Sequence, residues 1–101
     1  MIDPSGVIAV YYMLLYDVVP DYLERRVPLR KGHLKLAKEA HARGELLLAG
    51  AFADPGDGAA LVFVASDRFV AERFARNDPY VMEGLVREWK VRKWNVVVGG
   101  E

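Results

Sequence analysis

The sequence contains no cysteine among its 101 residues and only two histidines, His33 and His41. The first absence excludes disulfide bridges, thiolate metal sites and a cysteine nucleophile, so the fold has to rest on its apolar core. The spacing of the two histidines matches no zinc motif, and the chain has neither a Gly-x-Gly-x-x-Gly sequence nor a phosphate-binding loop. We therefore expect no metal site and no cofactor.

The chain also lacks an excess of charge and a long apolar run. Its 14 Lys and Arg residues balance 14 Asp and Glu residues, so the overall charge does not indicate a nucleic-acid partner. No apolar stretch approaches the roughly 20 residues that span a bilayer, and residues 1–6 lack the basic start of a signal peptide. We expect a cytoplasmic protein that binds neither nucleic acid nor a membrane.

The length and the apolar content predict one domain with a protein partner. A chain of 101 residues is typical of a single domain, which we assign to residues 1–101 with loose tails at 1–6 and 99–101. Hydrophobic residues make up 52% of the chain, which is more than one small core needs. Either some elements are buried on both faces, or the protein associates with another chain.

Four apolar segments predict four strands. The first is β-branched and aromatic without alternation, which is typical of a strand covered on both faces. The next two flank a turn-forming cluster at residues 54–58, as in a β-hairpin. The last alternates only in part, and its apolar set changes side near Lys93, which predicts a bulge or a change of partner strand there. The predicted strands are residues 6–19, 45–52, 60–65 and 85–98.

Helical patterns lie between the first two strands and between the last two. A capping box that begins at Asp21 predicts a helix from Tyr22, and a second helical segment covers residues 28–43 before a glycine cap at Gly44. The later helix begins after a cap at Ser66 or Asp67 and ends at residue 77, because the residue before a proline leaves the helical region.

This βαββαβ order predicts an α+β, ferredoxin-like fold with a four-stranded antiparallel sheet and two helices on one face. Two helices cover only one face of such a sheet, yet the first strand and the hairpin strands are apolar on both sides. The simplest cover for the second face is the same face of another copy. We therefore expect a homodimer formed through the open sheet face.

His33 and Asp78 are the main candidates for chemistry. His33 lies on the apolar side of the predicted helix, where an imidazole needs a hydrogen-bond partner. An imidazole can also serve as a general acid or base near neutral pH. Asp78 follows the later helix and is the natural partner that fixes the imidazole tautomer. Simpler roles remain open: His33 as a core-edge residue bonded to a carbonyl, and Asp78 as a turn residue. His41 is expected on the solvated surface.

Arg30 and the tyrosines are candidates for substrate contacts. Arg30 lies three residues before His33, close to the same side of the helix, so it can hold an anionic group of a ligand. A solvated helix surface explains it equally. A tyrosine hydroxyl can donate to a developing oxyanion, although packing explains each tyrosine too. The candidates are Tyr11, Tyr12, Tyr16 and Tyr80.

Three motifs resemble the YciI-like (YCII-related) family over most of the chain. They are Leu29-Arg30-x-x-His33-Leu34, Gly44-x-Leu46 with Leu48-Ala49-Gly50, and Phe74-x-x-x-Asp78-Pro79-Tyr80 followed by Gly84-Leu85.

The resemblance implies the fold of the dimeric α+β barrel superfamily. It also implies that His33 and Asp78 form an active-site pair and that Arg30 is the basic residue before the histidine. Two positions depart from the family pattern: Ala51 stands where many members have proline, and Pro28 interrupts the first helix.

These observations lead to one main hypothesis about function and two alternatives. We expect a cofactor-independent lyase or isomerase that acts on a small organic molecule, with His33 as acid and base and Asp78 as its orienting partner. Arg30 and Tyr80 are expected to contact the substrate. The first alternative is a non-catalytic dimeric module that binds a small ligand, and the second is a purely structural dimer.

Overall fold

The computed structural model describes residues 10–99. The predicted loose tail at 1–6 lies outside these residues, as do residues 100 and 101 of the tail predicted at 99–101. Among residues 10–99, no helix combines the length and the apolar character needed to cross a membrane.

The described chain has the predicted βαββαβ order, and the helix predicted from Tyr22 is present. The short helix at Pro79–Met82 was not predicted. The strands are β1 (Val10–Val18), β2 (Leu46–Ala51), β3 (Gly58–Ala65) and β4 (Val86–Trp94). The helical segments are α1 (Tyr22–Arg25), the 3-10 turn η1 (Val27–Leu29), α2 (Arg30–Ala42), α3 (Phe69–Asn77) and α4 (Pro79–Met82).

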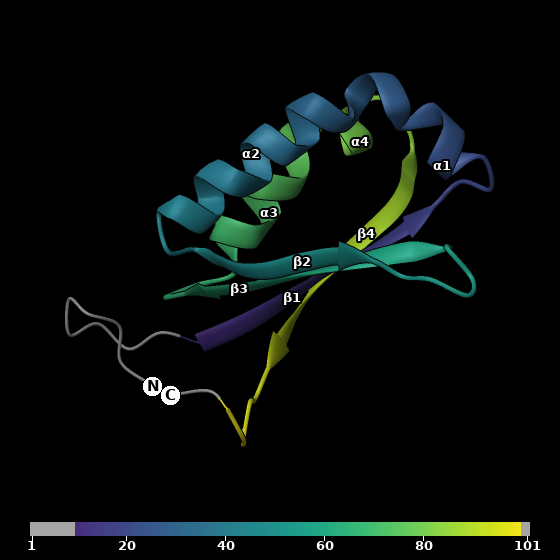
Figure 1. The fold of residues 1–101 in the computed structure, drawn as a ribbon. Coiled ribbons are helices and arrows are strands. Elements are labelled where there is room, and N and C mark those ends of the chain that lie inside the picture. The colour runs from purple at the N-terminus through teal and green to yellow at the C-terminus, as the bar shows by residue number, and fades with distance from the viewer. Residues whose placement is uncertain (1–9, 100–101) are drawn as a thin grey trace.

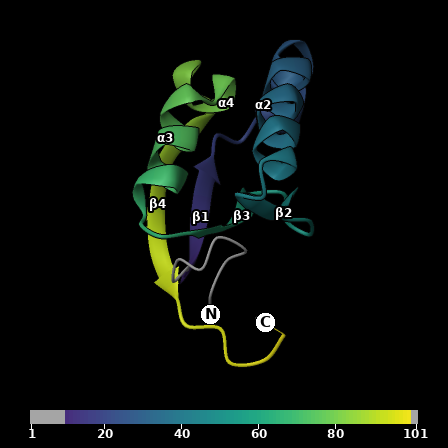
Figure 2. The same ribbon diagram turned by 90° about the vertical axis from the view of Figure 1, so that its left-hand side faces the viewer.

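The four strands form one sheet in the order β2-β3-β1-β4. All neighbouring strands are antiparallel, with β1 paired to both β3 and β4. The helices lie together on one face of this sheet, above the strands in Figure 1 and on the same side in the turned view of Figure 2. The predicted ferredoxin-like α+β fold is therefore confirmed.

The core lies between the sheet and the helices. Alternate side chains of β1 are buried on this side because successive residues of a strand point to opposite faces. They pack against apolar side chains of α2 and α3, which follow helical spacing. Buried members of this core include Leu14, Leu61, Phe63, Ala40, Ala71 and Phe74.

The opposite face of the sheet carries an apolar strip beside a charged row. Tyr11, Met13 and Leu15 alternate with the core residues of β1, and their side chains are half-buried. No helix of residues 10–99 lies over this face (Figure 2). On the neighbouring β4, the exposed Lys90 and Arg92 pair with Leu15 and Met13, and the exposed Trp94 pairs with Tyr11. Glu88, opposite Asp17, continues the charged row on the same face.

One predicted helix cap is correct in position and another is wrong. Asp21 occupies the cap position of α1, which begins at Tyr22 as predicted, although its side chain makes no capping hydrogen bond. The residue at the cap position of α3 is Arg68, although Asp67 Oδ1 accepts the N–H of Phe69 at 2.7 Å. The predicted glycine end of α2 is correct, because Gly44 has φ +80° and donates its N–H to the carbonyl of His41.

Neither the bulge nor the change of partner strand predicted near Lys93 is present in the described residues. Pairing between β1 and β4 runs without interruption from Tyr11 to Asp17 and shifts only between Asp17 and Val18, at the other end of the ladder. The apolar set changes side near Lys93 because β4 ends at Trp94, one residue later, and the chain beyond it is no longer strand.

Candidate active site

Asp78 is a fully buried carboxylate between two helices. The Pro79 that follows it holds Asp78 in an extended conformation, with φ −76° and ψ 123°, which ends α3 and begins α4. Its Oδ1 accepts the backbone N–H of Tyr80 at 3.0 Å. Local sequence therefore fixes where the carboxylate lies, and its side chain has no exposed surface.

The structure brings His33 into contact with this carboxylate. His33 lies on the inner side of α2, and its Nδ1 is 2.9 Å from both Oδ1 and Oδ2 of Asp78. An ionised carboxylate only accepts hydrogen bonds, so Nδ1 carries the proton and donates it. The second ring nitrogen, Nε2, has no hydrogen-bond partner among residues 10–99 and is free to accept a proton.

Tyr16 supplies the third donor to Asp78. Tyr16 lies near the C-terminal end of β1, and its hydroxyl donates to Oδ2 at 2.7 Å. Burial raises the pKa of Tyr16 above its ordinary value, and the negative charge of Asp78 raises it further. Tyr16 therefore keeps its proton and acts as a permanent donor to the carboxylate.

The ring of Tyr80 forms one wall beside His33. The two rings stack with centroids 4.0 Å apart and planes 9° from parallel, and Tyr22 meets Tyr80 edge-on at 5.7 Å. Burial raises the pKa of Tyr80, although the positive charges of Arg26 and Arg30 act in the opposite direction. The Tyr80 hydroxyl is buried and makes no hydrogen bond within the described chain.

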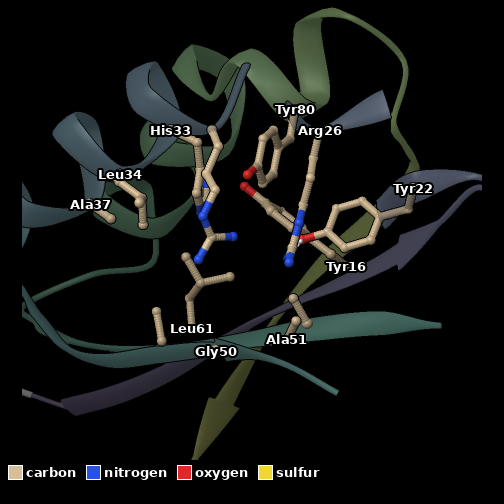
Figure 3. A pocket seen from close by; sticks show the side chains of 13 residues that line it. Tyr16, Tyr22, Arg26, His33, Leu34, Ala37, Gly50, Ala51, Leu61 and Tyr80 are labelled. Atoms are coloured by element: carbon tan, nitrogen blue, oxygen red, sulfur yellow. Dashed lines mark hydrogen bonds between the residues drawn. The ribbon is translucent and has the colours of Figure 1, made fainter. Parts of the chain in front are cut away.

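A pocket of about 400 Å³ opens beside His33 and Tyr80, between the helices and the sheet. Figure 3 shows helix-borne side chains above this space and side chains of the sheet below it. A volume of this size suits a small organic molecule. The pocket is lined by Tyr16, Tyr22, Arg26, Arg30, His33, Leu34, Ala37, Ala49, Gly50, Ala51, Ala59, Leu61 and Tyr80.

Small residues make room for this pocket on the sheet. Ala51 pairs with Ala59, and Ala49 pairs with Leu61, which is a buried residue of the helix-covered face. Larger side chains at the three alanine positions would fill the space below His33. The sequence signal for this space is the run Ala49-Gly50-Ala51, in which Ala51 stands where many family members have proline.

Two arginines give the pocket a positive charge. Arg30 lines it as the sequence analysis expected of a substrate contact, and Arg26 lines it as well. Within the described residues neither guanidinium forms an ion pair, and Arg26 lies over the Tyr22 ring at 5.3 Å and donates to the Tyr22 hydroxyl at 3.4 Å. The sequence did not identify Arg26 and Tyr22 as site residues, because the 3-10 turn η1 separates both from α2.

The remaining candidates lie elsewhere. Tyr11 and Tyr12 do not line this pocket. His41 is exposed as expected, but it is not simply solvated, because its Nδ1 hydrogen-bonds the carbonyl of Leu46 at 2.7 Å. Among residues 10–99, no group of three or more His, Asp or Glu side chains lies close enough together to hold a metal ion.

Comparison with known proteins gives a family match and several fold matches. The sequence pattern of the YCII-related domain matches residues 10–95. A search of curated proteins finds no match.

Three solved structures illustrate the fold matches. The first is the 5-chloro-2-hydroxyhydroquinone dehydrochlorinase of Burkholderia phenoliruptrix in complex with 2,5-dihydroxybenzoquinone. It is 19% identical with a TM-score of 0.71, and the match covers 84% of this chain and 93% of that chain. A protein of Bacteroides thetaiotaomicron assigned as an antibiotic biosynthesis monooxygenase is 12% identical with a TM-score of 0.59, over 92% and 93% of the two chains. A conserved protein of Methanosarcina mazei is 15% identical with a TM-score of 0.54, over 88% and 93%. At these identities the matches establish the fold.

The raised pKa of Tyr16 predicts a loss of stability at alkaline pH. Tyrosine in an unfolded chain titrates near pH 10, so above this pH the unfolded state releases a proton that folded Tyr16 retains. The free energy of unfolding should therefore fall by about 1.4 kcal/mol between pH 9 and pH 11 from this group alone. Urea titrations at both pH values measure the change.

Tyr16→Phe is the matched control, since phenylalanine keeps the ring and cannot ionise. This variant should be less stable at both pH values, because Asp78 loses a donor. Between pH 9 and pH 11, however, it should lose about 1.4 kcal/mol less than the wild type. An equal loss in the two proteins would contradict the assignment.

Proposed function

The chain belongs to the YCII-related domain family, and we propose that it is a cofactor-independent enzyme of the lyase or isomerase type that moves a proton on a small organic molecule. The observation that carries this proposal is the contact between His33 and the buried Asp78. It leaves Nε2 as the basic nitrogen of an imidazole that lines the pocket. A side chain held in this way is suited to general acid–base catalysis.

In the proposed reaction, Nε2 of His33 accepts a proton from the substrate. The imidazole becomes positively charged, and the adjacent Asp78 carboxylate stabilises this cation. The donors from Tyr16 and from the Tyr80 backbone keep the carboxylate in place while the proton is held. In an isomerisation, His33 then returns the proton to another atom of the substrate. In an elimination, the leaving group departs with the bonding electron pair, and His33 passes the proton to a basic leaving group or, where chloride leaves, to solvent.

Arg30 and Tyr80 are proposed to contact the substrate. Proton removal leaves negative charge on the substrate, and a guanidinium beside the pocket stabilises this charge. Tyr80 lies against His33, so its ring also holds the imidazole plane in one orientation. The stacking places the binding contact and the acid–base group side by side.

The structural similarity to a dehydrochlorinase is compatible with an elimination reaction. That protein shares the fold of this chain at 19% identity, and its complex contains a single-ring dihydroxyquinone. A pocket of about 400 Å³ has room for one such ring. The similarity selects compounds for a first screen, while the reaction class rests on His33 and Asp78.

The alternative is a non-catalytic module that binds a small ligand in the same pocket. In that case the His33–Asp78 contact only satisfies a buried carboxylate, and the ligand leaves unchanged. The unpaired Nε2 favours the catalytic function over this alternative. A purely structural contact with Asp78 uses only Nδ1 and does not require that Nε2 be left without a partner beside a pocket.

Proton transfer by His33 is tested with wild type, His33→Gln and Asp78→Asn. The substrates are 5-chloro-2-hydroxyhydroquinone, followed by chloride release, and cyclic ketones with acidic C–H groups, followed by deuterium uptake from solvent. General acid–base catalysis contributes about 10² to 10⁴ in rate, so His33→Gln should lower the rate at least 100-fold. Asp78→Asn should lower the rate less, because Nε2 remains.

The matched control is His41→Gln, which removes the second histidine far from the pocket lining and should leave the rate unchanged. An equal rate in His33→Gln and wild type would rule out the acid–base role. Binding of a compound without turnover or exchange in the whole panel would favour the non-catalytic module.

We also propose that a second copy of the chain covers the open sheet face, so that the protein is a homodimer. The apolar strip formed by Tyr11, Met13 and Leu15 is the surface that this contact would bury. The charged row on β4 contains both signs, with Glu88 two residues from Lys90. A twofold contact can therefore pair these charges at its rim.

The dimer predicts that a charge in the apolar strip separates the two copies. Leu15→Glu places a carboxylate at the centre of the proposed contact, where it would be buried without a partner. Light scattering after size exclusion should then give the mass of one chain, against two chains for wild type. Leu23→Glu is the control, because Leu23 is 56% exposed on α1. A single-chain mass for wild type would contradict the dimer.

A further inference from the structure

The positive charge of the pocket has no counter-charge within the described residues. Arg26 and Arg30 both line the pocket without an ion pair, whereas Arg25, one residue away, has a carboxylate oxygen of Asp21 at 3.9 Å. The nearby Asp78 carboxylate does not line the pocket and already accepts hydrogen bonds from three residues. The two guanidiniums are therefore available to an anion that enters from solvent.

The unpaired hydroxyl of Tyr80 is a second feature that indicates a ligand. Tyr80 is 1% exposed, and its hydroxyl has no hydrogen-bond partner among residues 10–99. A buried hydroxyl without a partner is costly, and native structures normally satisfy it. Arg30 lies close enough to lower the pKa of this phenol, yet the two groups do not form a hydrogen bond of ordinary geometry. A ligand oxygen at this point would accept from both.

The shape of the pocket limits what the rest of the ligand can be. Its floor is formed by small residues of the sheet, Ala49, Gly50, Ala51 and Ala59, together with the larger Leu61. Tyr22 stands at the side, and its ring is held beneath the Arg26 guanidinium. An apolar floor below polar groups, with the aromatic rings of Tyr22 and Tyr80 in the wall, suits a flat ring that stacks against them.

From these features we infer that the ligand is a single-ring, planar organic anion with its charge on oxygen, held by Arg26 and Arg30 and hydrogen-bonded by Tyr80. The inference rests on the proposed function in using the same pocket, and it adds the substrate class and the role of Arg26. Carboxylates and enolates share this chemistry, since each spreads a negative charge over oxygen atoms in one plane.

Binding of matched anionic and neutral rings tests the substrate class. The probes are benzoate as the carboxylate, the enolate of 1,3-cyclohexanedione, and benzamide as the neutral counterpart of benzoate. Calorimetry at neutral pH should show at least one anion bound at least tenfold more tightly than benzamide. The anion that binds identifies which of the two sources, carboxylate or enolate, the pocket accepts.

Variants of the three recognition residues test the contacts. Arg26→Gln and Arg30→Gln should each weaken binding of the preferred anion about tenfold or more, as expected for the loss of a charged hydrogen bond. Tyr80→Phe should weaken binding severalfold without lowering the urea midpoint, because it removes a hydroxyl that has no partner in the described chain. Arg25→Gln is the matched control and should bind like wild type, because Arg25 does not line the pocket.

Three results would overturn the inference. These are benzamide binding as tightly as the anions, undiminished anion binding in both Arg26→Gln and Arg30→Gln, and no binding of either anion. The outcome is separable from that of the proposed function. If anion binding depends on the arginines but His33→Gln keeps the full rate, this inference is supported and the proposed catalysis is contradicted. If His33 is needed for turnover and only neutral compounds are turned over, the catalysis is supported and this inference is contradicted.

Discussion

A carboxylate with no solvent-exposed surface needs several hydrogen-bond donors, and Asp78 receives them from three different elements of the fold. The hydroxyl of Tyr16 comes from β1, the imidazole of His33 from α2 and a backbone N–H from α4. Burial of an unpaired charge costs several kcal/mol, so removal of one donor leaves a penalty that the others have to offset. The carboxylate therefore ties the sheet to two helices and fixes the imidazole at the same time.

The same constraint explains which parts of the site were predictable from the sequence. Asp78 precedes Pro79 and His33 lies on the apolar side of a helix, so both positions carry a local signal, and the family resemblance connects them. The order of strands and helices along the chain was predictable because apolar segments and turn residues are local signals too. The sequence could not distinguish Tyr16 from the three other candidate tyrosines. Its role depends on the long-range fold, which brings its hydroxyl to Asp78, 62 positions away in the sequence.

Arg26 and the alanine floor show the limit of sequence reasoning in another way. Arg26 precedes the 3-10 turn η1, so no continuous helical spacing connects it to His33. The alanines of β2 and β3 become a floor only because β2 pairs with β3 in one register, Ala51 beside Ala59. The prediction at Lys93 was wrong for the same reason. The change of side in the apolar pattern reflects where β4 ends, and pairing with β1 decides that end. Local patterns predict the elements, and long-range pairing decides which side chains meet.

The central claim is that Asp78 holds His33 with its proton on Nδ1, so that Nε2 is the base that faces the pocket. Long-range proton–nitrogen NMR spectra of the two histidine rings, recorded at a pH where they are neutral, report this tautomer directly. The account predicts that His33 carries its proton on Nδ1 in wild type, and that Asp78→Asn weakens this preference for His33 while His41 is unchanged. A His33 ring protonated on Nε2 in wild type would contradict the account, because no basic nitrogen would then be left for the substrate.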